Sequence, residues 1–269
     1  MDRLPTSLAQ LFASLSPGSA ETFAAPQWRR HFEARGVEGT FVLFDPARER
    51  YHVLDEARAR RRFLPGSTFD IPAALVGLEV GSLSDEKEVF RWDGRPKPVA
   101  SWERDQTLVT GMREGAAWMF QQVARRTGKA LMREWLDRLE YGNRDIAGGI
   151  DLFWLQGALR VSAMEQVAFL HRLAEGRLAA TQRAQRLVRE ALAVERSRER
   201  TLYAKGEAVA SGRDAVAWWV GWIERRGRPE AFFAMNFAPG PKGALADCAA
   251  LGRAILAEAG ALPGGFPRA

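Results

Sequence analysis

The sequence predicts an α+β fold in which both ends of the chain build one antiparallel sheet and a helical region lies between them. Runs near both ends have the apolar pattern of strands, whereas the middle repeats apolar residues at three- and four-residue spacing. Such an order is expected to give one sheet, an inserted helical lobe and a cleft between the two. The chain has 269 residues, 46% of them hydrophobic and 27% charged, which suits one large domain or two intimately packed halves.

Five runs are predicted to be strands. Near the N-terminus, 39–44 and 50–54 are joined by the turn-forming Asp45-Pro46 and predict a hairpin. Near the C-terminus, three runs with short, turn-rich links predict an antiparallel meander. These three runs are 201–205, 215–223 and 231–237.

The region between the strands is predicted to be mostly helical. One helix is expected to open at Ser67, after the chain-breaking Pro65-Gly66, and to end at Gly81. The other predicted helices span 104–127, 128–139, 162–174, 181–194 and 243–259. For the whole chain, we expect a flexible N-terminal segment over 1–25, a domain over 26–262 with its helical lobe at about 85–195, and a tail over 263–269.

The chain is basic, with a net charge of +6 and an isoelectric point near 10.0. A basic surface can bind nucleic acid or an anionic envelope. Neither arginine cluster carries the interleaved aromatic residues of a nucleic-acid platform, so we expect a soluble, arginine-rich surface and no nucleic-acid partner. The clusters are Arg58, Arg60, Arg61 and Arg62, and Arg196, Arg198 and Arg200.

Membrane insertion, disulfides and metal binding are not expected. No apolar stretch approaches the roughly 20 residues that a membrane-spanning helix needs. The run 8–15 is interrupted by Gln10 and Ser14 and makes a poor leader, so either an export signal has been removed or none exists. Cys248 is the only cysteine, which excludes an internal disulfide. The three histidines lie on separate predicted elements without ligand spacing: His31, His52 and His171.

Ser67 taken alone is a serine at a helix start, where such residues usually act as caps. Its neighbours and five further segments, taken in order, resemble motifs of one enzyme family. The segments are Leu64–Phe69, Phe90–Gly94, Trp102–Asp105, Tyr141–Asn143, Gly148–Leu155 and Ala217–Trp222. Together they resemble the class D serine β-lactamases, the oxacillinases, from about Trp28 to about Leu262.

This resemblance implies the serine β-lactamase and penicillin-binding transpeptidase fold, in which an antiparallel sheet flanked by helices adjoins an all-helical lobe. It also implies a periplasmic enzyme that opens penicillins by acylating a serine and then hydrolysing the acyl-enzyme. A β-lactam-like small molecule is therefore the expected ligand. Both monomers and homodimers are compatible with the resemblance.

The nucleophile motif of the family is Ser-x-x-Lys, and its carboxylated lysine is the general base. This chain has Ser67 and, in place of the lysine, Asp70. Asp70 forms no carbamate, so no such cofactor is expected, and burial should raise its pKa. The shorter carboxylate is expected to reach Ser67 through water and to reach the deacylating water poorly. Trp154 matches the tryptophan that holds the carbamate and, without that partner, is better described as a core residue.

The second motif, Ser-x-Val in the family, aligns with Gly115-Ala116-Ala117. The hydroxyl that passes a proton to the leaving nitrogen is therefore absent at Gly115. Ala117, like Gly115, is expected to line the substrate site. The family's arginine on the closing helix falls near Cys248, for which we favour a buried structural role.

The third motif should read Lys-Thr-Gly, but this chain has Lys205-Gly206-Glu207. The threonine that binds the substrate carboxylate is lost, and Glu207 would bring a side chain and a negative charge close to an anionic β-lactam. Alternatively, a one-residue deletion makes Gly206 the motif glycine. Lys205 is expected to pair with Asp70 or Glu207 in an emptied pocket.

Three hypotheses follow from these substitutions. In the first, the protein binds β-lactams or is slowly acylated by them at Ser67 and barely turns over. In the second, it is a catalytically inactive member, either a pseudoenzyme or a deliberately disarmed variant, that acts as a binding or structural protein. In the third, the fold runs a different acid–base reaction with Asp70 as the base.

Overall fold

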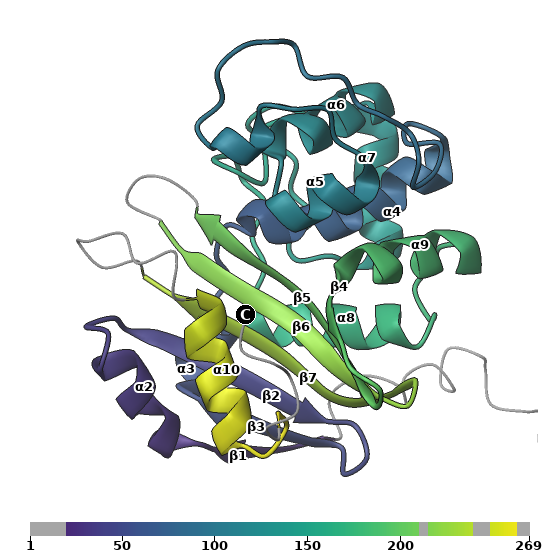
Figure 1. Cartoon of the computed structure of the whole chain (residues 1–269). Helices are drawn as coiled ribbons and strands as arrows, with labels where there is room; N and C mark the ends of the chain where they lie inside the picture. The colour runs from purple at the N-terminus through teal and green to yellow at the C-terminus, as the bar shows by residue number, and fades with distance from the viewer. Residues whose placement is uncertain (1–19, 210–214, 239–247, 263–269) are drawn as a thin grey trace, which may run out of the picture.

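A seven-stranded sheet forms the centre of the molecule, with helices on both of its faces (Figure 1). The computed structural model describes residues 20–209, 215–238 and 248–262, with the backbone only for 207–209. The strand order is β1-β3-β2-β7-β6-β5-β4, and neighbouring strands are antiparallel except for β1 and β3. The strands are β1 (Glu21–Ala24), β2 (Gly39–Asp45), β3 (Arg50–Leu54), β4 (Ala193–Arg196), β5 (Arg200–Val209), β6 (Ala217–Arg225) and β7 (Arg228–Phe237).

The two ends of the chain meet in the middle of this sheet. Strand β2 pairs with β7 from Gly39 opposite Phe237 to Phe44 opposite Phe232. The predicted hairpin and the predicted meander are therefore parts of one sheet. The α+β prediction, with the sheet assembled from both termini, is confirmed.

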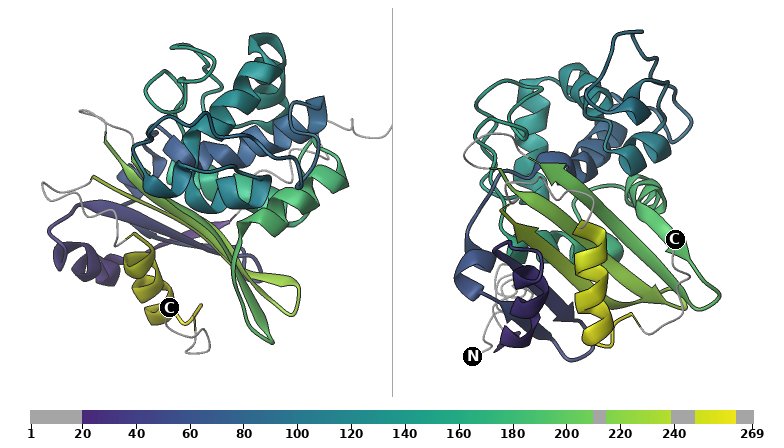
Figure 2. Two further views of the ribbon diagram at one scale, coloured as in Figure 1. Left: turned by 45° about the horizontal axis from the view of Figure 1, so that its top comes forward. Right: turned by 60° about the vertical axis from the view of Figure 1, so that its left-hand side comes forward.

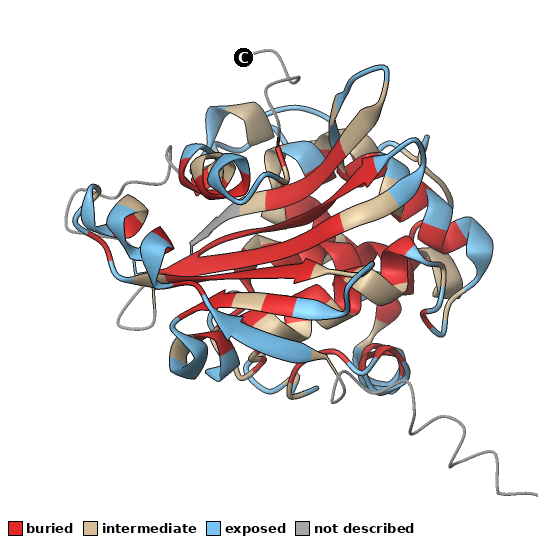
Figure 3. Cartoon of the chain, turned by 90° about the horizontal axis from the view of Figure 1, so that it is seen from below, coloured by how far each residue is buried: buried red, intermediate tan, exposed pale blue. Residues whose placement is uncertain are grey.

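Strand β6 shows how the sheet is stabilised. Its side chains alternate between two apolar cores, with Trp218, Val220 and Trp222 in one and Trp219 and Ile223 in the other. Because both faces are covered, every residue of the strand except its last is buried. Figure 3 shows the same continuous burial in the central strands. Burial on both faces explains why this segment is an uninterrupted apolar run.

Helices of different origin cover the two faces (Figure 2). One face carries α2 (Arg29–Glu33) and α10 (Cys248–Glu258), whereas α8 (Ala163–Ala174) packs on the opposite face against β7 and β2. The remaining helices of the middle region lie beside α8 and beyond the sheet (Figure 1). They are α4 (Asp70–Val80), α5 (Leu108–Glu114), α6 (Ala117–Thr127), α7 (Lys129–Leu139) and α9 (Gln182–Leu192), with the short α3 (Glu56–Arg60) preceding them.

Several predicted boundaries are wrong. The single helix expected over 104–127 is two helices, because the chain turns at Gly115, whose φ is +62°. The end of the helix expected over 181–194 belongs instead to β4, a short strand at the edge of the sheet. The parallel edge strand β1 was not predicted, because its four residues are all exposed and carry no apolar pattern. Of the closing helix expected over 243–259, the first five residues lie outside the described part.

Within the described residues, no helix is both long enough and apolar enough to cross a membrane.

Candidate active site

Ser67 lies at the entrance to a continuous helical segment. A 3-10 turn, η2 (Gly66–Phe69), leads directly into α4, which ends at Gly81 in the left-handed conformation. The turn is fixed by the Gly66 N–H, which donates to the Trp154 carbonyl at 3.1 Å. Ser67 makes no capping hydrogen bond and is partly exposed, while the residues that follow it are buried. Ser67 therefore lies within the turn, after its N-cap Pro65, and the interpretation of Ser67 as a simple helix cap is wrong.

The side chains of Asp70 and Lys205 form a buried ion pair. Lys205 Nζ lies 2.9 Å from Asp70 Oδ2, and the two side chains are 3% and 1% exposed. Lys205 Nζ also donates to the Met112 carbonyl at 2.7 Å, which ties β5 to the end of α5. Lys205 thus meets Asp70, one of the two partners expected for it, and its ammonium is bound by two groups of the protein itself.

Burial dominates the electrostatics of Asp70. Loss of water raises the pKa of Asp70 from 3.8 to about 6, although the Lys205 ammonium opposes this rise. Asp70 Oδ1 has no hydrogen-bond partner among the described residues. The desolvation of the carboxylate therefore outweighs the stabilisation that its counter-ion provides.

Gly115 lies beside both Ser67 and Lys205. A Cβ atom built on Gly115 would be 3.7 Å from Ser67 Oγ and 3.4 Å from Lys205 Nζ. A side chain at this position would accordingly reach the nucleophile, as the second motif requires. Glycine leaves no hydroxyl there, and its φ of +62° penalises any residue with a Cβ. Ala117, the first residue of α6, is partly exposed two positions further on.

Trp154 is fully buried and its indole N–H has no acceptor among the described residues. Its ring packs against Phe69, with the ring centroids 4.9 Å apart, directly before Asp70 in the chain. A buried donor without a partner is uncommon in proteins. Trp154 therefore packs as a core residue whose indole N–H is left unpaired among the described residues.

Gly206 has no room for a side chain. A Cβ at Gly206 would lie 2.5 Å from the Trp219 ring, and the pairing of β5 with β6 shifts register between Gly206 and Ala208. The side chain of Glu207, the intervening residue, lies outside the described part. Glycine is therefore required here by its packing against Trp219, which belongs to the core on the face of the sheet that carries α10.

Cys248 is fully buried at the start of α10, in the core on the far side of the sheet from α8. Within the described ranges, no group of three or more His, Cys, Asp and Glu side chains is arranged to hold a metal ion. Cys248 thus packs as a buried residue, as favoured from the sequence. The fold brings together four of the predicted site residues: Ser67, Asp70, Gly115 and Lys205.

Sequence reasoning missed the polar residues that support the nucleophile segment. Gln166 Nε2 on α8 donates to Thr68 Oγ1 at 2.7 Å, and Thr68 Oγ1 donates to the Pro65 carbonyl at 2.7 Å. These fully buried bonds hold the turn on which Ser67 lies. Gln166 carried no signal in the sequence, because it occupies an ordinary position of an amphipathic helix.

Comparison with known proteins gives consistent matches. Residues 39–257 match the penicillin binding protein transpeptidase domain. The chain is 42% identical over 212 residues to β-lactamase OXA-10 of Pseudomonas aeruginosa, covering 78% of this chain and 79% of that protein. It is 38% identical over 255 residues to β-lactamase OXA-5 of the same organism, covering 94% of each.

Solved structures agree with these sequence matches. The class D β-lactamase YbXI from Nostoc superposes with a TM-score of 0.82 at 30% identity, covering 87% of this chain and 98% of that one. The class D β-lactamase BAT-2 gives a TM-score of 0.81 at 32% identity, with coverages of 88% and 97%. Sequence and structure together show that the chain belongs to the class D β-lactamase family.

Proposed function

We propose that this protein binds penicillin-like β-lactams and is slowly acylated by them at Ser67, with hydrolysis of the acyl-enzyme weak or absent. The observation that carries the proposal is the buried ion pair between Asp70 and Lys205, at 2.9 Å. The family resemblance supports a periplasmic location for this activity.

The base is the first group affected. Asp70 has no amine that carbon dioxide could carboxylate, so the family's carbamate has no counterpart at this position. Its short carboxylate is held at the Lys205 ammonium, and proton transfer requires heavy atoms about 2.6–3.2 Å apart, directly or through one water. Attack of water on an acylated Ser67 would accordingly lack a well-placed base.

The second group affected is the proton donor for the leaving nitrogen. Gly115 stands where a side chain would lie beside Ser67 Oγ and Lys205 Nζ, and glycine donates no proton. One acid–base group contributes about 10²–10⁴-fold to a rate, and losses within one catalytic unit are not additive. Ser67 remains near the N-terminal end of a helical segment, where backbone N–H groups favour negative charge and leave a residual rate.

Two other functions have specific support. The first is a catalytically inactive binding or structural protein. It is supported by the contacts of the Lys205 ammonium with Asp70 and the Met112 carbonyl, and by the indole N–H of Trp154, which has no partner among the described residues. A different acid–base reaction is supported by the pKa of about 6 for Asp70, because a general base is most effective near the working pH. One experiment distinguishes both of these functions from slow acylation.

The experiment combines nitrocefin hydrolysis with the intact mass of the protein after exposure to benzylpenicillin. We expect a mass increase of one penicillin with negligible hydrolysis, and no increase in Ser67→Ala. If the wild-type chain shows neither a mass increase nor hydrolysis, slow acylation is rejected and the inactive member is favoured. Hydrolysis that disappears in Asp70→Asn would favour an aspartate-driven enzyme. Rapid multiple turnover that requires Ser67 would contradict the proposal.

A further inference from the structure

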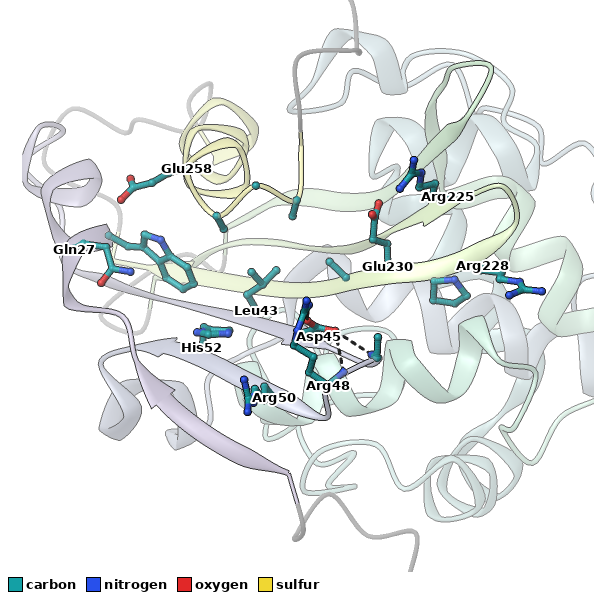
Figure 4. A pocket seen from close by; sticks show the side chains of 17 residues that line it. Gln27, Leu43, Asp45, Arg48, Arg50, His52, Arg225, Arg228, Glu230 and Glu258 are labelled. Carbon is teal, nitrogen blue, oxygen red and sulfur yellow. Dashed lines mark hydrogen bonds and ion pairs between the residues drawn. The ribbon is translucent and has the colours of Figure 1, made fainter.

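A hollow separate from the Ser67 site lies on the outer face of the sheet, where α10 leaves the strands uncovered (Figure 4). It has a volume of about 840 Å³ and is bounded by the β2–β3 turn, the β6–β7 turn and the C-terminal end of α10. None of the residues of the Ser67 site lines it. Its volume lies within the range of about 300–1,000 Å³ that is usual for small-molecule sites.

Four arginines come to this hollow from two adjacent hairpins. Because β2 pairs with β7, the two turns lie at the same end of the sheet. Figure 4 shows Leu43 at the centre of the floor, with Arg48 and Arg50 on one side and Arg225 on the other. The fourth, Arg228, follows the β6–β7 turn.

Each carboxylate that lines the hollow is already paired with an arginine. Asp45 is bound by Arg48 at 2.7 Å. Glu230 is bound by Arg200 at 3.0 Å and Glu258 by Arg30 at 3.0 Å, and neither of these arginines lines the hollow. The negative charges in the hollow are therefore neutralised locally.

The other three arginines are not matched in this way. Arg228 has no ion pair among the described residues, and Arg225 lies 4.0 Å from Glu199, whose carboxylate is held more closely by Arg226 at 2.6 Å. Arg50 lies 3.7 Å from Glu21, with both side chains well exposed, so this pair is weak. The Arg50 guanidinium also lies over the Phe23 ring, 5.2 Å from its centroid, which leaves its positive charge unneutralised. The hollow thus carries an excess of guanidinium groups.

We propose that this hollow binds a small organic anion with an apolar body, such as a medium-chain carboxylate. Guanidinium groups bind carboxylates through paired hydrogen bonds, and Arg50, Arg225 and Arg228 supply them. The floor of Leu43 and Ala231 and the small side chains at the end of α10 supply an apolar surface for the chain of the ligand. The site is independent of the function proposed at Ser67.

The test is titration calorimetry of the whole chain with decanoate, compared with decyltrimethylammonium and with acetate. We expect saturable binding of decanoate that weakens with added salt, no binding of the cation, and much weaker binding of acetate. Binding of the cation as strongly as decanoate would show non-specific adsorption and overturn the proposal. Equal binding of acetate would remove the role assigned to the apolar floor.

A charge reversal locates the ligand. Arg228→Glu breaks no ion pair among the described residues and should weaken decanoate binding by about tenfold or more, as expected for loss of one charged contact. The matched control is Arg133→Glu, which reverses an exposed arginine on α7 in the helical region and should leave binding unchanged. Ser67→Ala should also leave it unchanged. Equal effects of Arg228→Glu and Arg133→Glu, or no saturable binding by the wild-type chain, would overturn the proposal.

Discussion

Replacement of Lys205 by methionine tests the electrostatics of the site most directly. The substitution keeps most of the side-chain volume and removes the ammonium, which lies 2.9 Å from the Asp70 carboxylate and also donates to the Met112 carbonyl at 2.7 Å. Because the carboxylate is almost completely buried, it would be left charged and unpaired. Breaking a buried pair in this way costs about 3–5 kcal/mol of folding free energy.

The same variant predicts a pH dependence with a definite sign. An unpaired Asp70 can avoid being buried as an anion by taking up a proton, which costs about 1.4 kcal/mol for each pH unit above its ordinary pKa of 3.8. Protonation therefore limits the loss of folding free energy from the unpaired charge to about 6 kcal/mol at about pH 8 and to about 2 kcal/mol at about pH 5. The destabilisation by Lys205→Met should therefore be large at the higher pH and small at the lower one.

Urea unfolding of the wild-type chain and of Lys205→Met, at both pH values, measures the effect. In the wild-type chain the pKa of Asp70 is raised to about 6 in the folded state, so its contribution to stability is greatest below about pH 4 and is lost as the pH rises through 6. A double variant, Asp70→Ala with Lys205→Met, should recover much of the stability at the higher pH, since no charge is left buried. An equal loss in the single variant at both pH values would refute this reasoning.

Three further outcomes are expected. Added bicarbonate should leave the rates of acylation and hydrolysis unchanged, because Asp70 has no amine to carboxylate; a rise with bicarbonate would show that another residue serves as the base. Asp70→Lys alone should raise nitrocefin hydrolysis by less than about tenfold, since an acid–base group worth about 10²–10⁴-fold is still missing at Gly115; substantial activity would show that the other motifs matter less than we infer. Gly115→Ala should lower stability by about 1 kcal/mol, because alanine disfavours a φ of +62°; unfolding in urea measures this, and an unchanged midpoint would contradict the assigned conformation.

The sheet was well predicted from the sequence, and its edges were not. The central strands carry long apolar runs because both faces are covered, as in β6, where only the last residue is exposed. Strands β1 and β4 are short edge strands with exposed residues, so their sequences resemble those of loops. Their pairing is decided by neighbours that are distant in the chain, which local patterns do not report.

The residues that meet at the site, including the pair of Lys205 with Asp70, were predicted from the resemblance to the family's motifs, but the backbone contacts that hold them were not. Asp70, Gly115 and Lys205 were selected by alignment, and the fold brings all three together around Ser67. The Met112 carbonyl, which accepts from Lys205, was not predictable, because a backbone acceptor depends on where a helix ends and not on residue type. The break after α5 was also missed, since glycine within an apolar helical pattern is an ambiguous signal.

The buried pair also constrains how this protein could change over generations of mutation. A single exchange of Asp70 for lysine would remove the only described counter-charge of Lys205 and set a second amine beside it, in surroundings where the two native side chains are 1% and 3% exposed. One of these amines would have to give up its proton, and folding stability would fall before any catalytic benefit arose. A lysine at position 70 thus carries an immediate loss of stability, and the two positions are expected to change together or to stay as they are.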